Sequence, residues 1–299
     1  MSPVRGPVVP RRRLGAELRA LRDQAGLTIE DVAKELECSV SKVSRLETGQ
    51  GIPKSRDVRD LLDRYGVTDQ AHRDRLMRWV RDGQRQGWWD DFSDVLAPDP
   101  EDPLLPDNLS RYVALEQDAS EVRSFETIVF HGLLQTENYA RAILNTLSTA
   151  DEEATDRLVE LRMRRQRRLY AEEDPLIVHM VLDEAVLYRP VGGKQVMRGQ
   201  LKRLLDDAQR PNITIRVLPF SIGAHRSLAG SFVVLAFADS DDNDLVYIEG
   251  HVGDLYLEKE HDVAVYEQTF DVLVDRCMSA EQSVRLVATI LQDIDEEEG

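Results

Sequence analysis

The chain has 299 residues, of which 42% are apolar, enough for two domains with ordinary hydrophobic cores. Its longest apolar stretch, FVVLAFA at 232–238, is far shorter than the roughly 20 residues of a membrane-spanning helix, and the N-terminus lacks the apolar core of a secretory signal. The net charge of −17 is unevenly divided, because residues 1–90 carry +4 and the remainder carries −21; the basic part can meet phosphates, whereas most of the acids form a solvated surface.

Residues 1–13 are expected to form a flexible arm, because three prolines precede Arg11, Arg12 and Arg13. Such an arm either follows DNA phosphates or enters the minor groove, or it is a basic tail without function. Leucines at helical spacing from Leu14 onward then predict a first helix that ends near Gly26.

A helix, a short turn and a second helix are predicted between Thr28 and Gly49. Thr28 is followed three residues later by Asp31, as in a capping box, and the apolar spacing defines a helix over 28–36. Ser39 caps the second helix, and Gly49 supplies its C-terminal stop.

The connection between these helices has only about two or three residues, so the helices must cross steeply. Such a pair places its second helix in the major groove of DNA, although a helix pair that merely packs inside an all-helical protein has the same periodicity. The outward side chains suit base edges or phosphates: Val40, Ser41, Lys42, Ser44 and Arg45. Arg45 is the strongest candidate for a base contact, with a solvated surface arginine as the alternative.

Residues 18–53, LRALRDQAGLTIEDVAKELECSVSKVSRLETGQGIP, resemble the Xre (Cro and lambda-repressor-like) helix-turn-helix family. The resemblance extends to the Ser-Arg-Leu-Glu-x-Gly end of the second helix and implies an all-α, five-helix domain. It places Val40, Ser41 and Arg45 at base-contacting positions, with Lys42 and Ser44 beside them. It also places Arg22 and Glu47 at a structural ion pair, whereas Ile29 departs from the family's polar residue that often contacts the DNA backbone.

Two further capped helices, opened by Ser55 and Asp69, complete this DNA-binding domain over 14–86. Arginines 73, 75, 78, 81 and 85 either touch the DNA backbone or form a solvated face. The segment 87–110 is the expected linker, because prolines and acids cluster in PDPEDP. Its start, with Trp88, Trp89 and Phe92, is expected to dock as a cover; a ligand-stacking platform is the alternative.

From residue 111 onward helices alternate with strands, which predicts an α+β domain over 111–299 with a mixed, mainly antiparallel sheet. Strands are expected at 127–130, 176–182, 213–218, 231–238 and 245–249. Helices are expected at 111–124, 135–147, 151–170, 183–188, from the Gly192-Gly193 break to about 209, 260–277 and 280–294.

This second part resembles the uncharacterised C-terminal domain that follows Xre-type domains in many actinobacterial regulators. The motifs that carry the resemblance are GLLQT at 132–136, Arg162 with Arg165-Gln166, LDEA at 182–185 and VLPF at 217–220. His131 departs from the proline that usually precedes GLLQT. The resemblance implies a sensing or partner-binding module in a protein often encoded beside a very small partner.

An enzyme is not expected. Asp183 and Glu184 are adjacent on a helix and point about 100° apart, which does not make a general acid and base. The histidines lack metal-ligand spacing, and the cysteines, Cys38 and Cys277, have no CxxC partner, so neither a metal nor another cofactor is expected. Arginines on the 151–170 helix either form an anion-binding or partner-binding face, with Arg162, Arg165 and Arg168 as its candidates, or pair with nearby acids.

The sequence therefore predicts a cytoplasmic, nucleoid-associated regulator of transcription that binds double-stranded DNA as a homodimer. Its second domain is expected to receive a protein or small-molecule signal. The alternative is an antitoxin-like interaction protein that sequesters a small neighbour-encoded partner and uses its DNA-binding domain for autoregulation.

Overall fold

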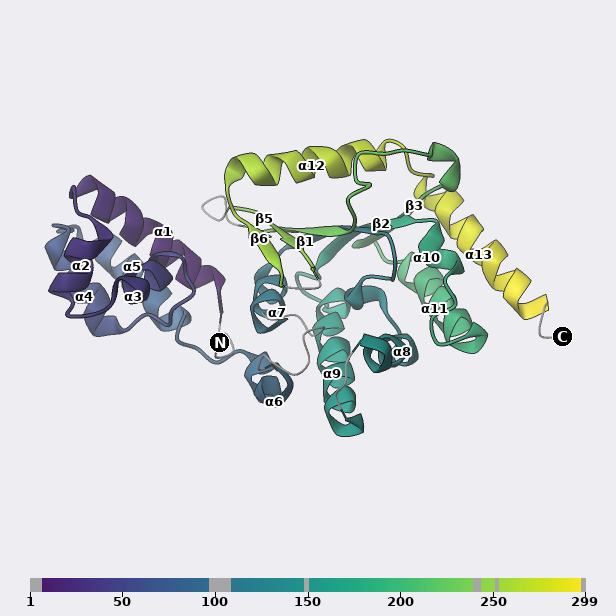
Figure 1. Ribbon diagram of the computed structural model, residues 1–299, viewed down its shortest axis with the longest axis horizontal. Coiled ribbons are helices and arrows are strands. Elements are labelled where there is room, and N and C mark those ends of the chain that lie inside the picture. The colour runs from purple at the N-terminus through teal and green to yellow at the C-terminus, as the bar shows by residue number, and fades with distance from the viewer. Residues whose placement is uncertain (1–6, 97–108, 148–150, 239–242, 251–252, 297–299) are drawn as a thin grey trace. The chain divides into compact units, whose positions relative to one another are not determined.

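The chain divides into two units, and Figure 1 labels the helices and strands of both. The computed structural model describes residues 7–96, 109–147, 151–238, 243–250 and 253–296. The first unit contains the described residues up to Asp94 together with Ser110–Asp118, and the second contains the rest. The sequence analysis begins the second domain at residue 111, whereas Ser110–Asp118 of the helix after the linker are grouped with the first unit.

The first unit is all-helical. Leucines at helical spacing on α1 and α4, including Leu14, Leu18 and Leu62, are completely buried, and burying each such side chain contributes about 1.5–3 kcal/mol. Its helices are α1 (Val9–Gln24), α2 (Ile29–Glu35), α3 (Val40–Glu47), α4 (Ser55–Arg64), α5 (Gln70–Asp82), a 3-10 helix (Trp88–Phe92), α6 (Ser93–Leu96), whose last two residues fall in the second unit, and α7 (Leu109–Asp118).

The backbones of α1 and α3 meet at Gly15. A Cβ atom at this position would lie 2.5 Å from the carbonyl oxygen of Glu47 and 2.6 Å from that of Leu46, distances that no side chain tolerates. Glycine is thus required where α1 crosses α3, and the crossing fixes the position of α3 in the helical unit.

The second unit contains a six-stranded sheet in the order β3-β2-β1-β4-β5-β6. Two neighbouring pairs, β1 with β2 and β2 with β3, are parallel, and the other three pairs are antiparallel. The predicted mixed, mainly antiparallel sheet is confirmed. Its strands are β1 (Glu121–Glu126), β2 (Ile177–Asp183), β3 (Ile213–Leu218), β4 (Phe232–Ala236), β5 (Leu245–Ile248) and β6 (Leu255–Leu257).

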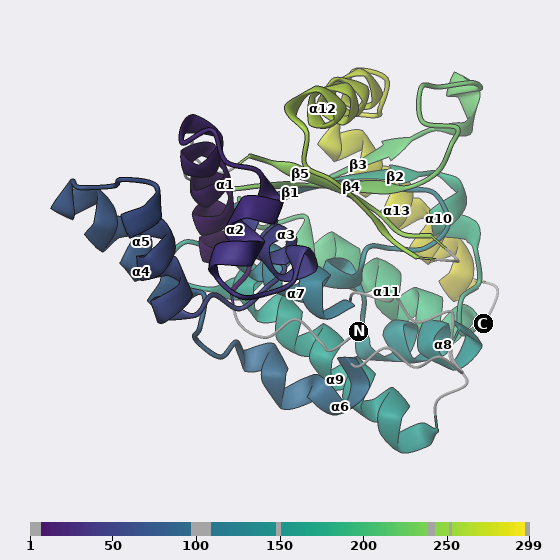
Figure 2. The ribbon, with the colours of Figure 1, turned by 60° about the vertical axis from the view of Figure 1, so that its left-hand side comes forward.

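Helices cover both faces of this sheet, as Figures 1 and 2 show. One face carries α12, whose Phe270 and Leu273 pack on Phe125 and Phe232 of the strands. The other face carries α8, α9 and α11, while α13 packs against α11 and β3. The helices are α8 (Glu137–Leu147), α9 (Glu152–Arg165), α10 (Ala185–Tyr188), α11 (Lys194–Asp207), α12 (Glu260–Val274) and α13 (Ala280–Glu296), with 3-10 helices at Gly132–Leu134, Gln166–Tyr170 and Phe220–Ile222.

The largest error in the predicted elements is at the start of the second domain. The helix expected over 111–124 ends at Asp118, and 121–126 is strand β1, whereas the strand expected at 127–130 is a loop. Leu115, Ala119 and Val122 continue a helical spacing, so the periodicity does not reveal the change. The short edge strand β6 was not predicted, because three residues carry no recognisable alternation.

Candidate nucleic-acid interface

The α2–turn–α3 pair is built as its sequence predicts. The Thr28 hydroxyl accepts a hydrogen bond from the Asp31 backbone nitrogen (3.2 Å), and the Asp31 carboxylate accepts one from the Thr28 nitrogen (3.0 Å), which completes a capping box. The Ser39 hydroxyl accepts from the Lys42 nitrogen at the start of α3. After α3, Gly49 has a φ of +68°, the left-handed conformation that favours glycine.

One side of α3 is buried and the other faces outward. Val43 and Leu46 lie in the hydrophobic core, whereas Val40 is 43% exposed and Ser41 and Arg45 are exposed. The Arg45 Nε donates to the Ser41 carbonyl oxygen at 3.3 Å, and no carboxylate among the described residues pairs with its guanidinium. Arg45 therefore projects an available bidentate donor from an exposed helix, beside Ser41 and the half-buried Ser44.

Lys42 differs from the other predicted contact residues. Its Nζ lies 2.5 Å from the Asp57 Oδ2 on α4, and the Asp57 side chain is only partly exposed. The ammonium group is therefore directed to α4 and already has a counter-charge. The sequence did not reveal this partner, because Asp57 lies on a different helix.

Arg22 and Glu47 form a buried, bidentate ion pair between α1 and α3. The Arg22 Nε lies 2.7 Å from the Glu47 Oε1, and its Nη2 donates to Oε2 at 3.1 Å. The same guanidinium donates to the Asp23 carboxylate and to the Leu27 carbonyl oxygen. The hydrogen bond to Glu47 is the main reason that the pKa of Arg22 is raised, and the pair helps to fix α3 against α1.

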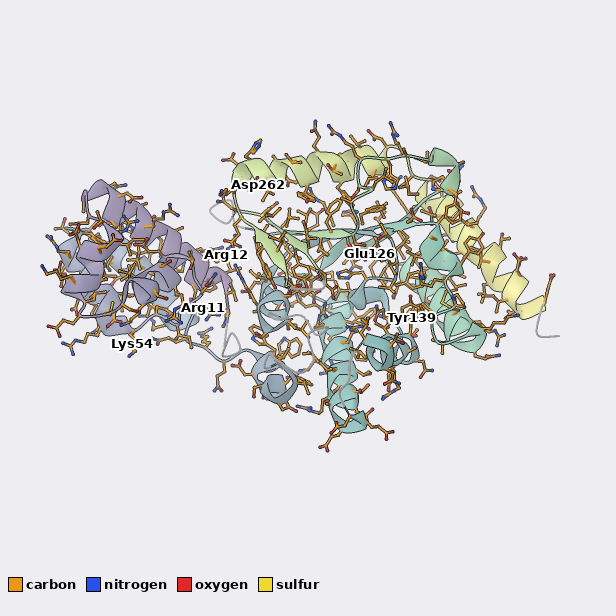
Figure 3. All side chains as sticks on the ribbon, in the orientation of Figure 1. Arg11, Arg12, Lys54, Glu126, Tyr139 and Asp262 are labelled. Atoms are coloured by element: carbon orange, nitrogen blue, oxygen red, sulfur yellow. The ribbon has the colours of Figure 1, made fainter. Side chains whose placement is uncertain are left out.

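The predicted N-terminal arm is helical from Val9 onward, and residues 1–6 lie outside the described part of the chain. Arg11, labelled in Figure 3, is only 2% exposed, and its Nε donates to the Pro7 carbonyl oxygen. Burial lowers the pKa of Arg11 to about 10, against the opposing effect of the Asp118 and Asp90 carboxylates. A contact between Arg11 and DNA is thereby excluded, and the expectation of a flexible arm is wrong for residues 9–13.

The start of the linker contributes to the first unit. Trp89 and Phe92 are buried, and the Trp88 Nε1 donates to the Gln117 Oε1 at 2.8 Å, which agrees with the expected cover. The rest of the predicted linker, 97–108, lies outside the described residues.

Basic groups outside α3 vary in their availability. On α5, Arg73 pairs with Asp63, and Arg75 lies over the Trp79 ring. Arg78 and Arg81 are exposed. The loop after α3 adds exposed Ile52 and, at the start of α4, exposed Lys54, which is labelled in Figure 3. Sequence reasoning missed Lys54, although a lysine just before the serine that opens α4 was a usable signal.

The arginine face predicted in the second domain is not an open surface. The Arg162 Nη1 donates to the Gln135 Oε1 at 2.8 Å, the Arg168 Nη1 donates to the Ala119 carbonyl oxygen at 2.5 Å, and Arg165 is buried. These side chains turn inward because buried carbonyl and amide oxygens need donors. Arg165 is therefore not available at the surface, and half-buried Arg162 and Arg168 each donate to a protein oxygen; an anion-binding or partner-binding role for these three arginines stays a prediction.

The GLLQT segment, residues 132–136, is held by amide side chains. The Gln166 Nε2 donates to the Gly132 and Gln135 carbonyl oxygens, and the Gln200 Nε2 donates to that of Leu134. No three His, Cys, Asp or Glu side chains within the described ranges are arranged to hold a metal ion. None of the helices in the described ranges has both the length and the apolar composition needed to cross a bilayer.

Comparisons with known families also divide the chain into two parts, although the second match begins at α7, which the fold groups with the first unit. A family described as "Helix-turn-helix domain" matches residues 13–76, and one described as "Domain of unknown function (DUF5753)" matches residues 109–289. No curated protein and no solved structure matches the chain. The helix-turn-helix domain indicates a DNA-binding regulator with an uncharacterised C-terminal domain. The DUF5753 match covers more than half of the chain, so the chain belongs to the DUF5753 family.

Proposed function

We propose that this protein is a sequence-specific transcriptional regulator that binds double-stranded DNA as a homodimer and reads bases with α3. The observation that carries the proposal is the outward side of α3, where Arg45 is exposed and has no carboxylate partner among the described residues. An arginine on such a helix can donate two hydrogen bonds to guanine in the major groove. Val40, Ser41 and Ser44 complete the surface that reads the bases. Lys42 contacts DNA only when its ion pair with Asp57 is broken.

The second domain, in this proposal, receives a protein or small-molecule signal and does not catalyse a reaction. The adjacent acids Asp183 and Glu184 each accept a local backbone hydrogen bond. The Asp183 Oδ1 accepts from the Ala185 nitrogen, and the Glu184 Oε2 accepts from the Phe220 nitrogen. These bonds support a capping role for Asp183 and a loop-fixing role for Glu184.

Substitution Arg45→Ala is expected to remove one base preference and to leave the others intact. Losing a bidentate contact costs about 1–3 kcal/mol of discrimination, or roughly 5–150-fold at that base pair. Sequences selected from a random duplex pool by the wild-type chain and by the variant provide the measurement. The wild-type motif is expected to contain two half-sites related by two-fold symmetry, about 34 Å apart or a multiple of it.

Arg78→Ala is the matched control, because it removes an exposed arginine from α5 and should leave the selected motif unchanged. If Arg45→Ala weakens binding to every sequence equally, Arg45 contacts phosphate and not a base. If the wild-type chain selects no motif, the proposal of sequence-specific reading fails.

Asp57→Asn is expected to release Lys42 for a phosphate contact. DNA affinity at low salt should then rise, and the plot of log K against log salt concentration should become steeper by about 0.9 for each protomer, the value for one additional phosphate contact. Asp60→Asn removes the same charge from another position on α4 and should change the slope less, since Asp60 lies near Arg56 and not near Lys42. An unchanged slope for Asp57→Asn would show that Lys42 does not reach the DNA.

A further inference from the structure

Two aromatic rings form an exposed stack at one edge of the sheet in the second unit. Tyr188 ends α10, which follows β2, and Phe220 follows β3. Their ring centroids lie 6.4 Å apart, with an angle of 24° between the ring planes. Tyr188 is 53% exposed and Phe220 is 60% exposed, so the stack offers its apolar surface to an incoming group.

Glu184 fixes this pair in place. Its Oε2 accepts a hydrogen bond from the Phe220 backbone nitrogen at 2.7 Å, and its own nitrogen donates to the Leu218 carbonyl oxygen at 3.0 Å. The bonds join the LDEA and VLPF segments where the parallel strands β2 and β3 end. The backbone that carries Phe220 is therefore fixed to the end of the sheet before any partner arrives, which lowers the entropy cost of binding.

Two more exposed apolar side chains lie on connections at the same end of the sheet. Ile128, just after β1, and Leu228, on the connection between β3 and β4, are also more than half exposed. Both connections lie at the end of the sheet where strands β1 and β3 have their C-termini. Several exposed large apolar groups at one edge are typical of a protein interaction site, where rigid aromatic anchors contribute most of the binding energy.

The charged groups that act on the Tyr188 phenol are negative. Burial first, and then the carboxylates of Glu184 and Asp293, raises the pKa of the Tyr188 phenol. Residues 91–299 also carry a net charge of −21. A second copy of the same acidic surface would be repelled, whereas lysine or arginine would be attracted and can also lie over an aromatic face.

We infer that the Tyr188–Phe220 stack is the docking site for a segment of a partner protein in which an apolar or aromatic anchor is flanked by basic side chains. This inference rests on the proposed role of the second domain as a receiver, and it names the chemistry of the signal as a basic, apolar-anchored polypeptide. The anchor packs on the two rings, and the basic groups face Glu184 and Asp293.

The test uses a library of random peptides displayed on phage and selected against the full-length chain. The selected peptides are expected to combine an aromatic or aliphatic residue with neighbouring lysine or arginine. Synthetic copies, measured by fluorescence anisotropy, should bind at least about tenfold more weakly to Phe220→Ala and Tyr188→Ala. Asp293→Asn should weaken binding several-fold at low salt, and this difference should shrink at high salt.

Val265→Ala is the matched control, because Val265 is an exposed apolar residue on α12, and it should bind the peptides like the wild type. The inference is overturned if no peptide is recovered, if the peptides are acidic or uncharged, or if the two aromatic substitutions leave their binding unchanged. It is also overturned if Phe220→Ala converts a dimer to a monomer in sedimentation, since the occupant is then a second copy.

DNA binding measured on the same preparations separates this inference from the proposed function. A wild-type chain that selects a DNA motif but no peptide contradicts the docking site alone. A chain that selects basic peptides but no DNA motif contradicts the reading role of α3 and leaves the docking site standing.

Discussion

Replacement of Arg22 by methionine is expected to lower the free energy of unfolding of the first unit by about 3–5 kcal/mol at neutral pH. The Glu47 carboxylate is buried, and within the described part of the chain its hydrogen-bond donors are the Nε and Nη2 of Arg22. Without them a buried negative charge has no partner, which is strongly destabilising.

Two further substitutions show whether the charge is the cause. Arg22→Met combined with Glu47→Leu should recover most of the lost stability, because it replaces the pair by apolar groups. Arg19→Met, at an exposed position on the same helix, should change stability by less than about 0.5 kcal/mol. A double variant as unstable as Arg22→Met would contradict this explanation.

Tryptophan fluorescence during urea unfolding of the full chain measures these effects. The three tryptophans of the sequence are Trp79, Trp88 and Trp89, and all of them belong to the first unit. Their signal therefore reports unfolding of that unit without interference from the second.

The Glu126→Gln variant is expected to be more stable than the wild type above neutral pH, by roughly 4 kcal/mol at pH 8. Glu126 is 8% exposed and ends β1 on the face opposite Phe125, toward the helical layer that contains Tyr139 (Figure 3). Burial, with a contribution from the charge of Glu249, raises its pKa from 4.5 to about 8, although the hydrogen bond from Ser124 acts in the opposite direction.

The sign of the pH effect follows from which state releases the proton first. Below pH 4.5 Glu126 is protonated in both folded and unfolded chains, so its contribution to stability is greatest there. Between pH 4.5 and 8 only the unfolded chain ionises, and each pH unit costs the folded state about 1.4 kcal/mol. Above pH 8 both states are ionised and no further loss occurs.

Hydrogen exchange of the β1 and β2 amides, followed by mass spectrometry and corrected for the intrinsic rate at each pH, tests this expectation. Glu126→Gln should abolish the decline in protection between pH 4.5 and 8. Glu249→Gln should shift its upper end to lower pH, because removing the nearby charge lowers the pKa of Glu126. Glu137→Gln, at an exposed position on α8, is the control. A decline that persists unchanged in Glu126→Gln would assign it to another group.

Features set by neighbouring residues were predictable from the sequence. The capping box at Thr28, the Ser39 cap and the glycine at the end of α3 depend on contacts within four residues, and they fix the two helices of the motif. Strand β3 was predicted with its observed bounds, because its alternating β-branched residues lie between a proline and a Leu-Pro turn.

Features that depend on distant residues were not predictable. Asp57 on α4 forms an ion pair with Lys42 on α3, and the Gln135 Oε1 of the GLLQT segment accepts a hydrogen bond from Arg162. Lysine and arginine are residue types that commonly bind DNA or anions, and only the fold determines which groups they contact. The same holds for Arg11. It is the third residue of helix α1, although the three prolines at the N-terminus argue against a helix there.

The grouping of Ser110–Asp118 with the first unit limits how this protein can be cut or recombined. The Trp88–Gln117 hydrogen bond and the contact from the Val9 nitrogen to the Asp118 carboxylate join α7 to elements that precede the linker. A fragment that stops before α7 loses both contacts and the carboxylate that favours the charged form of Arg11. Gene fusions that exchange the helix-turn-helix domain for another should therefore be joined after Asp118, at the two residues that lead into β1.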